Sequence, residues 1–283
     1  MPHLSHWEDR LKALYATFLV TLICAFPLGK AHAQSSNVDQ SALSGLLARH
    51  VNAKGWVDYA GLRQERPALQ SYLDTLRNVD AAKLPSDAAR LAFWINAYNA
   101  FTLNDVLEYV DGKTDSVKKV NGFFDKNKHP IAGESLTLDE IERRGRNLRD
   151  PRIHFAVNCA SASCPKLQPF AYTATELDRQ LNRVTSEFFA DPGRGLRLQK
   201  NENTVFLSPI LEWYAGDFSG TTSVTGQFLS RARAAISGDN VIEFVVNHVG
   251  QDVASYIRQK RPTVKYLDYD WTLNSQKLHP QGK

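Results

Sequence analysis

The strongest structural signal in the chain is a helix predicted over residues 87–110. Ser86 suits the N-cap position, because its hydroxyl can accept a hydrogen bond from the first turn, and Gly112 provides an end. Asn96 and Asn99 lie three residues apart and share the face that apolar residues continue. A buried amide without partners costs about 1–3 kcal/mol, so each of these side chains needs a polar group from another segment.

Shorter elements surround this helix. Further helices are predicted over residues 38–51, 69–76, 175–190, 209–214, 227–236 and 252–257, with one more beginning at the Thr137/Glu140 capping box. Extended segments are predicted over residues 56–59, 153–157, 196–198, 204–207 and 264–267, with the third and fourth forming a hairpin. Residues 120–133 resemble a loop, and residues 159–170 are irregular. The pattern predicts one α+β domain, residues 34–283, with helices packed around a small, mainly antiparallel sheet.

The first 33 residues match a secretory signal peptide. Two basic residues precede an apolar run over residues 13–26, and an A-x-A cleavage site ends at Ala33. We expect a mature chain that starts at Gln34, without a membrane span, in the periplasm or outside the cell. A single membrane anchor is the competing interpretation, but the run is shorter than the ~18 residues that a spanning helix needs.

Composition narrows the class of protein. With 43% hydrophobic and 23% charged residues the chain is of ordinary globular type, and a net charge of +4 is too mild for a nucleic-acid binder. The sequence contains no dinucleotide or phosphate-loop motif and no local cluster of histidines and cysteines. We therefore expect no cofactor and no metal.

Cys159 and Cys164 are the two cysteines that remain after signal cleavage. In an oxidising compartment, a close pair of this kind indicates a structural disulfide first. Two alternatives stay open. The pair can be redox-active, although C-x₄-C is not the usual spacing for thiol exchange, or a free Cys159 can act as a nucleophile.

A nucleophilic Cys159 needs a base within hydrogen-bond reach. His154 is the nearest histidine in sequence, but on a strand the odd spacing places the two side chains about 16 Å apart on opposite faces. His129 lies in the predicted loop and can fold over the site. Asn96 and Asn99 either hold the irregular backbone after Cys159 or orient the base and supply an oxyanion donor.

Three further residues are candidates for substrate binding. Tyr98 lies on the long helix, and Tyr214 and Asp217 form a polar and aromatic group after the hairpin. The structural alternatives are that Tyr98 belongs to the core and that Asp217 caps a helix or pairs with an arginine. The expected partner is an unidentified small molecule or a component of the cell envelope.

Two stretches are distinctive together: LAFWINAYNA at residues 91–100 and DPRIHFAVNCASASCP at residues 150–165. With VDY before them, and WY…DF and YDWTLN after them, they make the chain resemble the family of the domain of unknown function numbered 547, over about residues 39–274. The resemblance implies an often exported protein and no particular activity. Many members carry a histidine where this chain has Arg143, which argues against a family-wide Cys–His mechanism.

These observations lead to three hypotheses of function. The first is a cysteine-dependent hydrolase or transferase that acts on an amide or thioester in the cell envelope, with Cys159 as the nucleophile. The second is a non-catalytic envelope-binding or scaffold domain stapled by a Cys159–Cys164 disulfide. The third is a participant in thiol–disulfide exchange.

Overall fold

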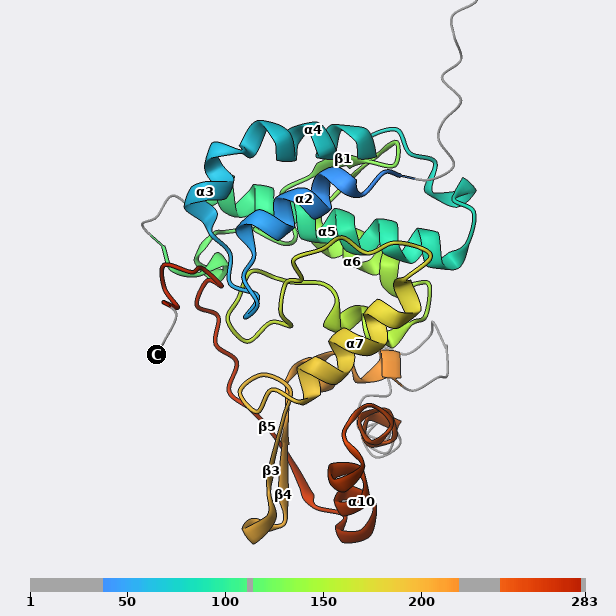
Figure 1. Ribbon diagram of the computed structural model, residues 1–283, viewed down its shortest axis with the longest axis vertical. Coiled ribbons are helices and arrows are strands. Elements are labelled where there is room, and N and C mark those ends of the chain that lie inside the picture. The colour runs from blue at the N-terminus through green and yellow to red at the C-terminus, as the bar shows by residue number, and fades with distance from the viewer. Residues whose placement is uncertain (1–37, 111–113, 219–239, 281–283) are drawn as a thin grey trace, which may run out of the picture. The chain divides into compact units, whose positions relative to one another are not determined.

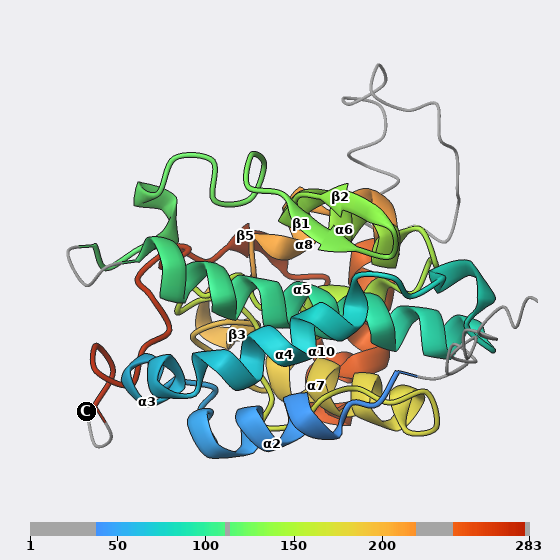
Figure 2. The ribbon, with the colours of Figure 1, turned by 90° about the horizontal axis from the view of Figure 1, so that it is seen from above.

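Helix α5 (Asp87–Tyr109) lies at the centre of the fold. The computed structural model describes residues 38–110, 114–218 and 240–280, all within the unit Ser35–Lys283. Ser86 caps α5 by accepting a hydrogen bond from Ala89 N, as predicted, and Gly112 lies outside the described residues. Most side chains of α5 are buried on all sides of the helix. It packs against α4, α6 and α7, with α2 lying on α4 (Figures 1 and 2).

The remaining helices agree with most of the predicted segments. The α-helices are α2 (Ser41–His50), α3 (Tyr59–Gln64), α4 (Arg66–Leu76), α6 (Leu138–Arg146), α7 (Leu177–Phe189), α8 (Ile210–Trp213) and α10 (Gln251–Lys260). Short 3₁₀ turns are η1 (Ala81–Lys83), η2 (Val117–Lys119), η3 (Pro151–Phe155), η4 (Lys200–Glu202) and η5 (Ala215–Phe218). Residues 240–248 are also helical, whereas the predicted segments 1–33 and 227–236 lie outside the described residues. None of the helices in the described ranges is long and apolar enough to cross a membrane.

Two small sheets accompany the helices. Strands β1 (His129–Ile131) and β2 (Glu134–Leu136) form an antiparallel pair. Strands β3 (Leu196–Gln199) and β4 (Thr204–Leu207) form the predicted hairpin, and β5 (Thr263–Tyr266) joins β4 in parallel. The α+β class is thus confirmed, but the strands form two sheets, and β1 lies in a segment predicted to be a loop.

The predicted central strand over residues 153–157 is wrong, because this segment lies mostly within the 3₁₀ turn η3. Pro151 occupies its first turn, and the Asp150 carboxylate accepts a hydrogen bond from Arg152 N, which caps the turn. Phe155 is fully buried among other aromatic rings. A short apolar run reports burial, and it does not by itself distinguish a strand from a helical turn. The correction removes the argument that His154 and Cys159 point to opposite faces.

Candidate functional site

The segment from Asn158 to Pro165, called the Cys159 loop below, is irregular and is held by hydrogen bonds. Asn158 closes it, because its Nδ2 donates to Pro165 O at 2.7 Å and its Oδ1 accepts from Ala160 N at 2.9 Å. The C-terminal segment adds a bond from Asn274 N to Ala160 O at 3.0 Å. Ala160 has a φ of 61°, in the left-handed region that costs a residue with a Cβ about 1–3 kcal/mol. The surrounding bonds therefore hold a strained backbone directly after Cys159.

The two buried amides of α5 hold backbone, as the structural alternative predicted, but at residues 156–158 and at Tyr172 rather than after Cys159. Asn99 donates to Ala156 O at 3.0 Å and accepts from Asn158 N at 2.8 Å, so it fixes the chain just before Cys159. Asn96 donates to Tyr172 O and accepts from Tyr172 N, both at 2.8 Å. Each amide thus uses both its oxygen and its nitrogen on backbone. These bonds make them positioning residues for the Cys159 loop and the segment at Tyr172.

Cys159 and Cys164 are free thiols whose Sγ atoms lie 2.8 Å apart. The Sγ of Cys159 also lies 3.1 Å from the Ser161 hydroxyl and 3.3 Å from the Tyr269 hydroxyl. Cys164 Sγ accepts a hydrogen bond from Cys159 N at 2.9 Å. The structure therefore presents the reduced pair and does not contain the predicted disulfide.

The environment shifts the pKa values of the two thiols in opposite directions. Burial raises the pKa of Cys159, but hydrogen bonds from Cys164, Ser161 and Tyr269 outweigh it and lower the pKa to about 7. Burial and the neighbouring Cys159 raise the pKa of Cys164 well above its ordinary value. At neutral pH, Cys159 is therefore substantially ionised while Cys164 keeps its proton. An ionised, partly exposed thiol is the form that reacts as a nucleophile.

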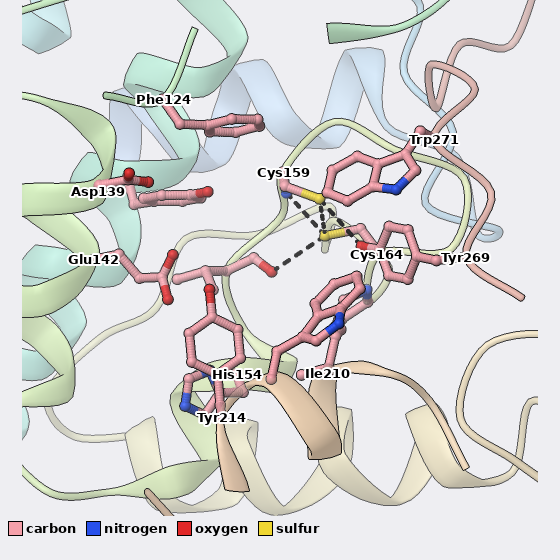
Figure 3. Close-up of a pocket in the computed structure, with 14 residues that line it drawn as sticks. Phe124, Asp139, Glu142, His154, Cys159, Cys164, Ile210, Tyr214, Tyr269 and Trp271 are labelled. Atoms are coloured by element: carbon pink, nitrogen blue, oxygen red, sulfur yellow. Dashed lines mark hydrogen bonds between the residues drawn. The ribbon is translucent and has the colours of Figure 1, made fainter. Parts of the chain in front are cut away.

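The pair lies in a pocket with aromatic walls (Figure 3). The cavity has a volume of about 150 Å³ and opens to solvent, which leaves room for a benzene-sized group. Six aromatic side chains line it: Tyr98, Phe124, Trp213, Tyr214, Tyr269 and Trp271. Of the predicted substrate-binding residues, Tyr98 and Tyr214 thus line the pocket and Asp217 does not.

Glu142 on α6 faces this pocket opposite the thiols (Figure 3). Its Oε1 atom is buried and has no hydrogen-bond partner. Burial raises the pKa of Glu142 to about 7, although Arg146 and a hydrogen bond with Tyr214 act in the other direction. Asp139, one turn earlier, also lines the pocket, and burial raises its pKa as well. The pocket therefore holds a carboxyl group that exchanges its proton near neutral pH.

Replacing Glu142 with glutamine is expected to stabilise the protein at pH 8 more than at pH 4.5. The folded state keeps the Glu142 proton up to about pH 7, while the unfolded chain releases it near pH 4.5, so the wild type loses stability as the pH rises between these values. The wild type thereby loses about 3 kcal/mol of unfolding free energy over this pH range, whereas the variant does not, because glutamine does not titrate. Urea unfolding of both proteins at the two pH values measures it. An advantage of the variant that is the same at both pH values would contradict the burial of an ionising Glu142.

His154 also lines the pocket, and its ring bonds to a half-buried ion pair between Asp217 and Arg146. Its Nε2 lies 2.8 Å from Asp217 Oδ2, which also accepts from Arg146 Nε at 2.6 Å. Burial lowers the pKa of His154, so the imidazole is neutral at pH 7. Burial would raise the pKa of Asp217, but its hydrogen bonds with His154 and Arg146 outweigh this effect and lower the pKa to about 2. The His154 ring packs on Tyr214 with 4.2 Å between centroids. Asp217 pairs with an arginine, as the structural alternative predicted, and the network orients Tyr214 at the pocket wall.

His129, the other predicted base, does not line this pocket. It is buried on β1 with its Nε2 3.1 Å from Asp105 Oδ2, and its ring packs on Phe101 with 4.6 Å between centroids. The structure thus brings Cys159 and His154 to one pocket and places His129 in the packing of β1 against α5. No histidine or carboxylate within the described ranges hydrogen-bonds to Cys159, and no group of three or more potential ligands there can hold a metal ion.

The sequence did not predict Glu142, Ser161 or Tyr269 as residues of the thiol pocket and its contacts. A signal for Glu142 was present: it lies four residues after Leu138 and three before Gly145, both buried, so helical spacing puts it on the inward face of α6. Ser161 follows Cys159 by two residues and was a local candidate. Tyr269 comes from the distant C-terminal segment, and no pattern in the sequence relates it to Cys159.

Together, the fold and the site define an α+β domain with an activated dithiol on the floor of an aromatic pocket. Residues 82–189 match the family described as "Protein of unknown function, DUF547", which confirms the resemblance inferred from the motifs, and this segment is a member of that family. The match spans α5 to α7 and includes both asparagines, Glu142, His154 and both cysteines. Comparisons with curated proteins and with solved structures found no match.

Proposed function

We propose that this protein is a thiol–disulfide oxidoreductase that uses Cys159 as the attacking thiol and Cys164 as the resolving thiol. One observation carries the proposal: two free thiols lie 2.8 Å apart with oppositely shifted pKa values. Exchange needs a thiolate that attacks and a second thiol that stays protonated until the mixed disulfide forms. The accessible Cys159 and the buried Cys164 match these two roles.

The reaction balances within the pair and its substrate. The Cys159 thiolate attacks one sulfur of a substrate disulfide, so a new S–S bond forms, the substrate S–S bond breaks, and the first thiolate leaves and takes a proton. Cys164 then loses its proton and attacks Cys159 Sγ, which releases the second substrate thiolate. The substrate disulfide gains two electrons and two protons, and the dithiol becomes a Cys159–Cys164 disulfide. The same steps in reverse oxidise a substrate dithiol.

The hydrolase or transferase hypothesis has less support. Acyl transfer needs a base for the nucleophile and donors for the oxyanion. Cys159 has no histidine or carboxylate partner in the described structure. The backbone N–H groups of Cys159 and Ala160 already donate to Cys164 Sγ and Asn158 Oδ1. The scaffold hypothesis leaves the low pKa of Cys159 and the open aromatic pocket without a role.

Export is part of the proposal. The N-terminal pattern of residues 1–33 supports a periplasmic or secreted protein that begins at Gln34. An oxidising compartment supplies disulfides as substrates. N-terminal sequencing of the protein recovered from a bacterial periplasm tests this, and recovery of an uncut chain from the cytoplasm would contradict it.

The exchange reaction is tested with the reduced full chain and bis(2-hydroxyethyl) disulfide, followed by intact mass and thiol counting. The wild type is expected to lose both thiols without gaining an adduct. Cys164→Ala is expected to stop as a mixed disulfide on Cys159, and Cys159→Ala to remain unmodified. A wild type that keeps both thiols, or that accumulates the adduct without closing its own disulfide, would overturn the proposal.

A further inference from the structure

The lining of the thiol pocket has an uneven charge. Two carboxyl groups, Glu142 and Asp139, face the cavity, and no lysine or arginine is among the described residues that line it. Two cations near this lining are paired with other groups. Arg146 pairs with Asp217 at 2.6 Å and lies over the Tyr214 ring, and Lys118 lies over the Trp271 ring, 4.3 Å from its centroid. A bound ligand therefore meets acidic groups and ring faces.

The aromatic residues near the thiols form an open wall of three rings. Tyr269 packs against Trp213 and Trp271, with centroid distances of 4.9 Å and 4.6 Å, and the two tryptophan rings stack at 6.0 Å. Trp213 is 49% exposed, which is unusual for so large an apolar side chain. The faces of such rings attract organic cations, and the attraction is strongest where water is excluded. The chain itself contains one such cation–π contact, between Lys118 and the Trp271 ring.

Glu142 adds an unpaired hydrogen-bond acceptor to this pocket. Its Oε1 atom is buried and lacks a hydrogen-bond donor, and the Glu142 side chain lines the cavity. Leaving such an acceptor unpaired costs free energy, which a donor from a ligand would recover. A protonated amine satisfies the carboxylate and the ring faces together. In Figure 3 the carboxyl groups lie on one side of the cavity and the thiols on the other, so one ligand can reach both.

We infer that this pocket selects small disulfides that carry an ammonium group a short chain away from sulfur. The ammonium group lies between the aromatic wall and Glu142, and its disulfide faces Cys159. The redox step of this inference rests on the proposed function, whereas the binding of the ammonium group does not. Anionic disulfides are disfavoured, because their carboxylates would face Glu142 and Asp139.

Binding is tested without any disulfide, by calorimetric titration of the reduced full chain with 3,3-dimethylbutylamine, which is protonated at neutral pH, and with its neutral isostere 3,3-dimethylbutanol. The amine is expected to bind at least about tenfold more tightly. Glu142→Gln keeps the shape of the side chain and is expected to remove most of this preference. Glu212→Gln removes an exposed carboxylate beside Trp213 that does not line the pocket, and is expected to leave it unchanged. Equal binding of the two ligands, or equal loss in both variants, would overturn the inference.

Selectivity in the reaction is tested with three disulfides of similar size: cystamine, bis(2-hydroxyethyl) disulfide and dithiodiglycolate. Each rate is divided by the rate with free 2-mercaptoethanol, which corrects for the intrinsic reactivity of the disulfide. The order is expected to be cation, neutral, anion, with at least about tenfold between the first and the last. If disulfides react without a charge preference, the proposed function stands and this inference fails. If the amine binds selectively but no disulfide reacts, the ammonium site stands and the redox function fails.

Discussion

At pH 6, Cys159 in the wild type is expected to react with iodoacetamide about ten times faster than Cys159 in the Cys164→Ala variant. A pKa of about 7 in place of 9.0 gives about a hundredfold more thiolate at this pH. The intrinsic nucleophilicity of a thiolate falls as its pKa falls, which cancels about tenfold of that gain. Among the groups that lower the pKa of Cys159, Cys164 has the largest effect, so its removal should return the thiol toward ordinary behaviour.

The rate is measured as a function of pH, with peptide mapping to follow Cys159 alone. Cys164→Ser is the conservative comparison, because its hydroxyl can still donate to the thiolate, and it should keep the titration midpoint near that of the wild type. Ser163→Ala is the control for loop distortion, since the Ser163 hydroxyl binds Asp270 N and makes no contact with Cys159 Sγ. Identical midpoints for the wild type and Cys164→Ala would show that the second thiol does not activate the first.

The local parts of this structure follow from the sequence. Ser86 and the Thr137/Glu140 capping box mark the beginnings of α5 and α6, because a cap acts on backbone groups within one turn. The hairpin of β3 and β4 is equally local, with a polar tip between two apolar runs. The inward direction of Asn96 and Asn99 follows from helical spacing and the cost of an unpaired buried amide.

The site itself depends on contacts that local patterns do not encode. Cys159 meets Tyr269 across more than a hundred residues of chain, and Glu142 reaches the same pocket from α6. The wrong prediction of a strand at η3 illustrates this limit. The apolar residues there indicate burial, and a turn and a strand can bury them equally well. Once the turn replaces the strand, His154 and Cys159 line one cavity. The sequence thus located the thiols but not their neighbours, which set their chemistry.

Gly195→Ala is expected to destabilise the protein by about 3 kcal/mol or more, although it adds only one methyl group. A Cβ at this position would overlap Phe188 O and would lie 2.9 Å from Phe189 Cα. These are backbone atoms at the end of α7, so no side chain can rotate away to make room. Overpacking against backbone forces the helix end and the start of β3 apart.

This displacement should reach the site, because Arg194 precedes Gly195 and donates to Ala162 O in the Cys159 loop at 2.8 Å. Thermal unfolding is expected to shift down by about 6–12 °C. The control is Gly216→Ala, where the added Cβ meets no atom within 4 Å and should change the transition little. If Gly195→Ala unfolds at the same temperature as the wild type, the backbone between α7 and β3 can move to admit the methyl group at little cost in free energy. In that case the Cys159 loop would depend for its position on Asn99 and Asn158 rather than on Arg194.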